Sequence, residues 1–166
     1  SPALMGKCVG KTIPINFISP QGKFLAKVCG ETKGNVFLRV AQIDCFREKR
    51  LQLTQNTIAA KLSNTVQVLR RSLHDNPQLR QDEQMKKVIA SLISSIDKVY
   101  EADSVEEIIG IEGYCAQSYF SVFDRLITAP DSPFQFSCRI KHPPLDPVNA
   151  LLSFVYTLAK TEYAAA

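Results

Sequence analysis

The chain has 166 residues, enough for one domain with a substantial core, and 45% of them are hydrophobic, as in an ordinary globular protein. No apolar run approaches the roughly 18 residues of a membrane helix, so we expect no membrane partner. The net charge of +4 is uneven: residues 1–50 carry nine Lys and Arg against three acidic residues, and residues 101–166 carry four against nine. This imbalance fits polyanion binding and fits an unevenly charged solvated surface equally well.

The cysteines and the chain ends add two constraints. The five cysteines are widely spaced, form no Cys-x-x-Cys pair and accompany only two histidines, so no zinc site is expected. We expect buried free thiols in a reducing cytoplasm. The chain starts at Ser1 within a helical pattern and ends on Ala164-Ala165-Ala166 without a glycine cap, which predicts a fragment of a longer protein.

The first residues indicate a short helix followed by a β-hairpin. Residues 2–9 favour a helix, and residues 12–18 and 24–28 favour two strands around a turn at 19–22. Pro14 restricts the first strand to a sheet edge or a strand start. Because two strands are not stable alone in water, we expect a missing sheet partner upstream.

The middle of the chain has helical periodicity. It predicts helices over residues 35–46 and 48–73 and, after a break at 74–77, a third over 81–100. The apolar stripes of the two longer helices are Leu51, Ile58, Leu62, Val66, Leu69 and Leu73, and Met85, Val88, Ile89, Leu92, Ile96 and Val99.

A fourth helix should follow directly. Ser104 and Glu107 form a capping box that opens it, and the helical pattern continues to Leu126. We expect Gly110 and Gly113 to interrupt or bend this helix, because glycine weakens a helix interior.

The last part of the chain predicts an extended arm and a final helix. Residues 134–140 and the following Pro143-Pro144 favour extended backbone. Asp146 is a suitable N-cap and Pro147 a suitable first helical residue. The helix over 148–163 is apolar nearly all round, so we expect it to be central and buried.

Glu112 is the most unusual residue of the fourth helix. Helical spacing from it reaches apolar and aromatic positions: Cys115, Ala116, Tyr119, Phe120 and Phe123. A charged carboxylate on such a face is costly unless something compensates it. Three possibilities stay open: a basic side chain in a structural ion pair, a divalent metal ion, or a proton that permits general-acid chemistry.

Two groups of polar residues are candidate phosphate contacts. Arg139, Lys141 and His142 lie on the extended arm, just before a helix N-terminus whose free N–H groups suit phosphate. The second group, on the helix over 48–73, is Lys61, Asn64, Arg70 and Arg71. For the arm, the alternative is a proline-rich connector whose charges are solvated. For the second group, the alternative is a solvated helix face.

Several longer segments match the motifs of a known family. They are Gly110-Ile111-Glu112-Gly113 with Tyr119-Phe120; Arg139-x-Lys141-His142-Pro143-Pro144-x-Asp146-Pro147-Val148-Asn149-Ala150-Leu151-Leu152-Ser153-Phe154-x-Tyr156; Ser1-Pro2-Ala3-Leu4-Met5-Gly6; Phe17-x-x-Pro20-x-Gly22-x-Phe24; and Gly34-Asn35-Val36-x-Leu38-Arg39-x-Ala41-Gln42. Together they resemble the CRISPR adaptation integrase, the first-numbered CRISPR-associated protein, and most closely its type I-C branch. In one departure, Lys141 and His142 stand where the family often has arginines.

The resemblance implies an α+β, predominantly α-helical fold. Residues 1–33 would be the C-terminal part of an N-terminal β-sandwich domain, represented by its last hairpin. Residues 34–166 would be the N-terminal part of a truncated, all-helical catalytic domain. The resemblance also implies a homodimer that works with the second CRISPR adaptation protein on double-stranded DNA in the prokaryotic cytoplasm.

The implied activity is that of a DNA endonuclease/integrase, which joins captured DNA into the CRISPR array by metal-dependent transesterification. In this family Mg²⁺ or Mn²⁺ is held by a Glu, a His and an Asp. Glu112 corresponds to the catalytic Glu, and the other two ligands are expected beyond Ala166, so the fragment alone should be inactive. The implied DNA-binding residues are Arg139, Lys141, His142, Asn149, Lys61 and Asn64. The alternative is a non-catalytic helical nucleic-acid-binding or dimerisation module.

Overall fold

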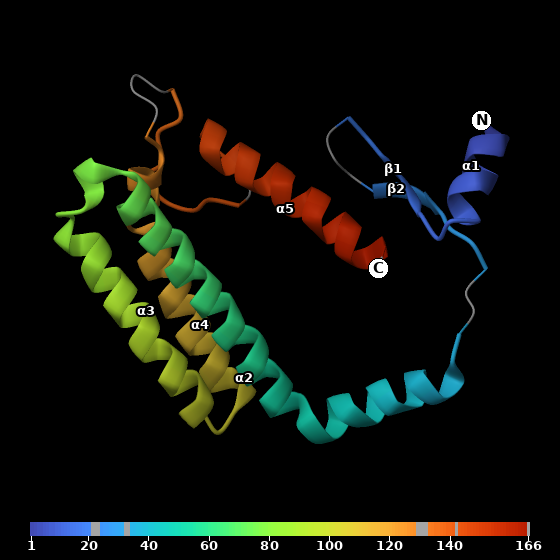
Figure 1. Cartoon of the computed structure of the whole chain (residues 1–166), viewed down its shortest axis with the longest axis horizontal. Helices are drawn as coiled ribbons and strands as arrows, with labels where there is room; N and C mark the ends of the chain where they lie inside the picture. Colours follow the sequence, from blue (N-terminus) through green and yellow to red (C-terminus); the bar gives the residue numbers. More distant parts are fainter. Residues whose placement is uncertain (21–23, 32–33, 129–132, 142, 166) are drawn as a thin grey trace. The chain divides into compact units, whose positions relative to one another are not determined.

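The computed structural model describes residues 1–20, 24–31, 34–128, 133–141 and 143–165, with backbone alone at 161–162 and 164–165 (Figure 1). The fold is mostly helical with one two-stranded sheet, as the sequence predicts. The chain divides into two compact units, Ser1–Asn35 with Ile140–Ala166, and Val36–Arg139. The proposed boundary between a β-domain and a helical domain at residue 33 stays a prediction. No helix in the described ranges is long and apolar enough to cross a membrane.

The first unit begins with a short helix and a hairpin. Helix α1 (Pro2–Val9) is capped by Ser1, whose hydroxyl accepts a hydrogen bond from the Leu4 N–H. Strands β1 (Ile15–Ile18) and β2 (Phe24–Val28) pair antiparallel, with a bulge after Phe17. The predicted hairpin is therefore confirmed, and the centre of its turn lies outside the described residues.

The same unit contains the last helix, α5 (Pro147–Ala165). Asp146 caps it as predicted, because its Oδ1 accepts a hydrogen bond of 2.7 Å from the Asn149 N–H. The prediction of a central, buried helix was wrong: Leu151 is 51% exposed and Val155 57%. An apolar composition permits burial on every side, but each side also needs a surface to pack against.

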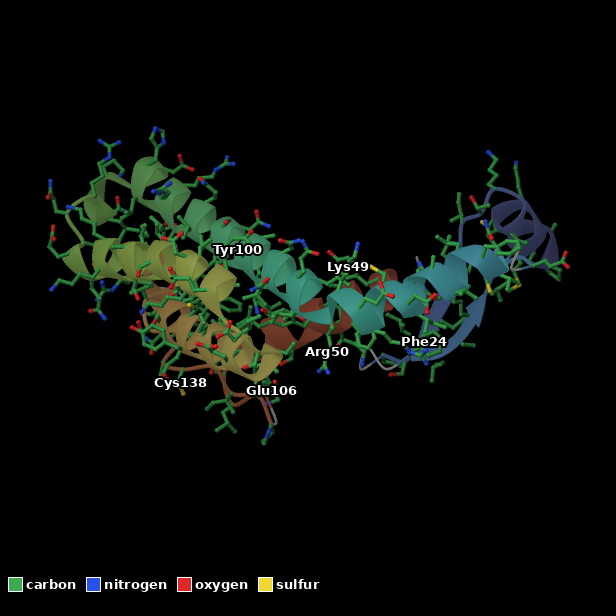
Figure 2. All side chains as sticks on the ribbon, turned by 90° about the horizontal axis from the view of Figure 1, so that it is seen from below. Phe24, Lys49, Arg50, Tyr100, Glu106 and Cys138 are labelled. Atoms are coloured by element: carbon green, nitrogen blue, oxygen red, sulfur yellow. The ribbon has the colours of Figure 1, made fainter. Side chains whose placement is uncertain are left out.

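The second unit is built from three long helices. Helix α2 (Val36–Asp75) joins the two predicted helices over 35–46 and 48–73 into one, with non-helical backbone at Lys49 (φ −121°, ψ 20°). Figure 2 marks Lys49 and the neighbouring Arg50 at this kink. The Arg50 guanidinium lies 5.9 Å from the centre of the Phe46 ring, which links the two sides of the kink by a cation–π contact.

Two further helices follow α2 after the short 3₁₀ helix η1 (Pro77–Leu79). They are α3 (Glu83–Glu101) and α4 (Val105–Phe120), and the 3₁₀ helix η2 (Phe123–Leu126) comes next. The predicted cap of α4 is confirmed, since Ser104 accepts from the Glu107 N–H at 3.2 Å. The predicted interruption at Gly110 and Gly113 is wrong, since α4 is continuous and a glycine costs a packed helix only about 1 kcal/mol. A bend at these glycines stays a prediction.

Residues 51–75 of α2 pack with α3 and α4 into what we call the three-helix bundle (Figure 1). Its buried residues are Ala59, Leu62, Val66, Leu69, Met85, Val88, Ile89, Leu92, Val99, Ala102, Ile108, Cys115 and Val122. The stripes predicted for the second and third helices supply most of this core, and Leu51, Ile58, Leu73 and Ile96 lie half-buried around it.

Polar contacts fix both ends of α3 in the bundle. At its start Asp82 caps the helix and forms an ion pair with Arg125 of η2. At its end the Gln55 side chain of α2 donates hydrogen bonds of 3.1 Å to the carbonyl oxygens of Tyr100 and Ala102. These bonds satisfy carbonyl groups at the end of the helix, including that of the buried Ala102.

The cysteines only partly follow the prediction of buried thiols. All five are free, as expected. Cys115 is buried, Cys8 and Cys45 are half-buried, and Cys29 and Cys138 are exposed. The wide spacing of the cysteines in the sequence therefore carried no information on their exposure.

Candidate functional site

Glu112 lies at the edge of the three-helix bundle where α4 faces α2. Its Oε1 accepts a hydrogen bond from the Lys61 ammonium group, and the two side chains form an ion pair. The Glu112 side chain is 28% exposed and that of Lys61 55%. Of the three compensations that the sequence left open, the structure contains the basic side chain. The carboxylate is half-buried rather than enclosed, so solvent still reaches it.

Glu112 has apolar surroundings on the side of the core and polar surroundings on the side of the solvent. Cys115, one turn further along α4, is buried in the core. Burial raises the pKa of the Cys115 thiol, and the nearby charge of Glu112 adds to this shift, against a hydrogen bond with Ser95 that lowers it. A thiol with a raised pKa is a poor nucleophile. On the solvent side Asn64 follows Lys61 by three residues on α2 and is exposed, so both share one helix face.

A divalent metal ion would need more donors than the described residues provide at this edge. Within the described ranges, no three His, Cys, Asp or Glu side chains are close enough together to hold a metal ion. Glu112 contributes one carboxylate, whose charge Lys61 already neutralises. The described residues by themselves therefore do not fit a Mg²⁺ or Mn²⁺ site. The His and Asp expected beyond Ala166 stay a prediction.

Asn149 joins the extended arm to the start of α5. It is completely buried, and its Oδ1 accepts a hydrogen bond of 2.9 Å from the Ile140 N–H. Its Nδ2 donates to Oδ2 of Asp146 at 2.6 Å. These contacts fix the backbone next to Lys141, which is exposed. Asn149 thus positions the arm, and a direct DNA contact by Asn149 stays a prediction.

The other predicted arm residues have different environments. Arg139 ends the unit Val36–Arg139 and is half-buried, whereas Lys141 belongs to the unit that begins again at Ile140. His142 lies outside the described residues. Of the predicted site residues, the structure brings together Glu112, Lys61 and Asn64, at the edge of the three-helix bundle where α4 faces α2.

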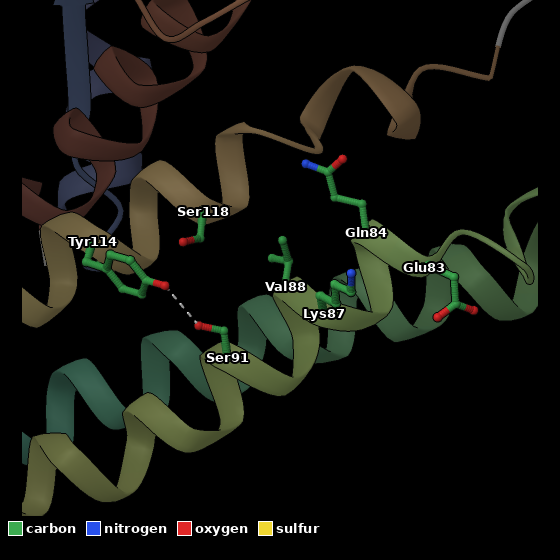
Figure 3. Close-up of a pocket in the computed structure, with 7 residues that line it drawn as sticks. All are labelled: Glu83, Gln84, Lys87, Val88, Ser91, Tyr114 and Ser118. Carbon is green, nitrogen blue, oxygen red and sulfur yellow. Dashed lines mark hydrogen bonds between the residues drawn. The ribbon is translucent and has the colours of Figure 1, made fainter.

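Sequence reasoning missed a groove between α3 and α4, with a volume of about 580 Å³. Figure 3 shows the residues that line it: Glu83, Gln84, Lys87, Val88, Ser91, Tyr114 and Ser118. Two pairs four residues apart, Lys87 with Ser91 and Tyr114 with Ser118, each mark one helix face. The spacing alone could have indicated these two faces, but only the packing of α3 on α4 makes them face each other.

Comparison with known proteins identifies relatives along the whole chain. A family model described as CRISPR associated protein Cas1 matches residues 1–166. The chain is 41% identical over 161 residues to CRISPR-associated endonuclease Cas1 1 of Chlorobaculum tepidum, and 40% identical over 162 residues to CRISPR-associated endonuclease Cas1 2 of Rhodospirillum rubrum. Each alignment covers 95% of this chain and 47% of the relative. The chain thus spans about half the length of these curated relatives.

Solved structures agree with this comparison at the level of the fold. A CAS1 protein from Thermotoga maritima is 25% identical, with a TM-score of 0.73 over 99% of this chain and 50% of that chain. A casposase bound to integration product shares the fold at 21% identity, with a TM-score of 0.72 over 98% of this chain and 44% of that chain. Assignment to the type I-C branch, and to a fragment, stays a prediction. With a family model matching every residue and relatives above one-third identity, the chain belongs to the Cas1 family of CRISPR-associated proteins.

Proposed function

We propose that the protein that contains this chain is a DNA endonuclease/integrase of CRISPR adaptation, which joins captured DNA into the CRISPR array by metal-dependent transesterification. Membership of the Cas1 family supports the proposal, together with relatives that are named endonucleases. The structural observation that supports it is the position of Glu112 at the edge of the bundle, where its carboxylate is 28% exposed and accessible to an ion from solvent. We also assign the chain to the type I-C branch and treat it as part of a longer protein, on the motifs quoted above.

Glu112 is the proposed catalytic residue and metal ligand. Mg²⁺ and Mn²⁺ prefer oxygen ligands, and a half-exposed carboxylate at a helix edge is a suitable one. The remaining ligands would come from residues that the structure does not describe. When bound, such an ion acts as a Lewis acid toward the phosphoryl group. Within this chain, Lys61 compensates the carboxylate charge and, with Asn64, forms a polar edge next to it.

The proposed DNA contacts come from the arm and from α2. Arg139 can bind a phosphate bidentately, and the exposed Lys141 can bind one as a point charge. Asn149 would act by fixing the arm through Ile140. We keep His142, Lys61 and Asn64 as further candidate contacts. The proposed partners are double-stranded DNA, a second copy of the protein, and the second CRISPR adaptation protein, since a structure of similar fold is titled Cas6-RT-Cas1--Cas2 complex.

A DNA-joining assay tests the proposal. The product of the complete gene, with the second adaptation protein, is supplied with Mn²⁺, DNA carrying free 3′-hydroxyls and a plasmid containing the CRISPR repeat. Glu112→Gln should slow joining at least about 100-fold, because the substitution removes a ligand oxygen and its charge. Glu106→Gln, on the exposed face of the same helix, should change the rate by less than about twofold. Equal rates for the two variants would contradict the assignment of Glu112.

For the 166 residues alone we propose a second function, a non-catalytic helical nucleic-acid-binding or dimerisation module. The supporting observation is that the described residues supply one carboxylate at the Glu112 edge, where a metal ion needs several oxygens. The test is cleavage or joining of DNA by the 166-residue chain with Mn²⁺. Activity that Glu112→Ala abolishes would refute this second function and leave the first intact.

A further inference from the structure

We propose that the groove between α3 and α4 binds a phosphate group of DNA, at a site separate from Glu112. This inference rests on the proposed function, because it takes DNA as the ligand. It assigns a role to residues that the sequence motifs do not include.

The groove wall offers several hydroxyl groups on two facing helices. Ser91 of α3 and Tyr114 of α4 approach across the groove, with 3.4 Å between Oγ and Oη, and Figure 3 shows this contact. Ser118 lies one turn beyond Tyr114 on the same face of α4. Hydroxyl hydrogens rotate to suit a ligand, so Ser91 and Tyr114 can both donate to an anion bound between them, and Ser118 offers a third hydroxyl in the same lining. The lining also includes Val88, which is buried.

The charges around the groove favour an anion. The one acidic side chain in the lining, Glu83, is paired with Lys86 at 2.9 Å between Oε1 and Nζ. In the described part of the chain, neither the Lys87 ammonium nor the Ser118 hydroxyl has a protein partner. The groove therefore has one uncompensated positive charge beside several donors. A phosphate, with a negative charge and several acceptor oxygens, matches this set.

Two features favour a nucleic acid over a small anion. The Tyr114 side chain is 57% exposed, so its ring also offers a surface on which a base or sugar can lie. The groove has room for a nucleotide unit rather than for an ion alone. Because Tyr114 follows Glu112 by two residues, the two side chains leave α4 in nearly opposite directions, about 200° apart around the helix. Loss of one site should therefore leave the other unchanged.

The test measures DNA affinity against salt, using the product of the complete gene and a fluorescently labelled DNA duplex. Lys87→Gln should weaken binding about tenfold at low salt and reduce the salt slope by about 0.9, the value for one phosphate contact. Ser118→Ala should weaken binding about threefold without changing the slope. The matched control is Lys98→Gln, which removes the same charge from an exposed lysine of the same helix, outside the lining. It should leave the slope unchanged.

The outcomes separate this inference from the proposed function. Equal slopes for Lys87→Gln and Lys98→Gln would overturn the groove site, because general surface charge would then explain both. Tighter binding of deoxyadenosine monophosphate than of DNA, lost in Lys87→Gln, would overturn DNA as the ligand. If Lys87→Gln joined DNA at the wild-type rate and bound DNA with unchanged affinity, the groove site would be overturned and the proposed function would stand. If the wild-type protein neither bound nor joined DNA, the proposed function would fail with it.

Discussion

Helix α2 contains two apolar regions with opposite environments. In the three-helix bundle, which includes residues 51–75 of this helix, Leu69 is fully buried, as is Met85 of α3 in the same core. In residues 36–46, before the kink at Lys49, Phe37 is 86% exposed and Ile43 54%. Apolar periodicity is present in both regions. The difference teaches that periodicity identifies the face that can be buried, whereas a partner surface decides whether it is.

The sharpest test of this comparison uses the same substitution in both regions. Leu92→Ala should lower the free energy of unfolding by about 2–5 kcal/mol, because Leu92 is 1% exposed and its loss leaves a cavity. Leu38→Ala should lower it by no more than about 0.5 kcal/mol, since Leu38 is 54% exposed. Urea unfolding followed by circular dichroism measures both. Equal losses would show that residues 36–46 are packed against a surface in solution.

The polar contacts at the end of the bundle should matter less than its core. Asp82→Ala removes both the cap of α3 and the partner of Arg125, so we expect a loss of about 1–2 kcal/mol in the free energy of unfolding. Glu83→Ala, in the first turn of the same helix, removes only an exposed ion pair and should cost at most about 0.5 kcal/mol. A larger loss for Glu83→Ala than for Asp82→Ala would contradict this account.

The same contrast explains what the sequence could predict. Helix stripes, the caps at Ser104 and Asp146, and the hairpin depend on residues a few positions apart, and the structure confirms them. The partner of Glu112 could not be predicted, because Lys61 is 51 residues away and meets it only through the packing of α2 on α4. The exposure of α5 depends on contacts between elements and could not be predicted either. The same holds for the position of Lys87 in the groove between α3 and α4. The family motifs predict a metal-ligand role for Glu112, which stays a prediction, and they did not predict its contact with Lys61.

The smallest expected effect comes from residues 36–46 themselves. Phe37→Ser should change the free energy of unfolding by at most about 0.5 kcal/mol, because an 86% exposed ring contributes little burial and the two residues have similar helix propensities. It should, however, lower the fluorescence of a hydrophobic dye added to the folded protein, since an exposed apolar surface is removed. Gln52→Ser, on the exposed side of the same helix, is the control and should alter neither quantity. A clear loss of stability in Phe37→Ser, with unchanged dye binding, would mean that this ring is covered by another surface in the protein. The two regions of α2 would then both be buried and would differ only in the surface that covers each of them.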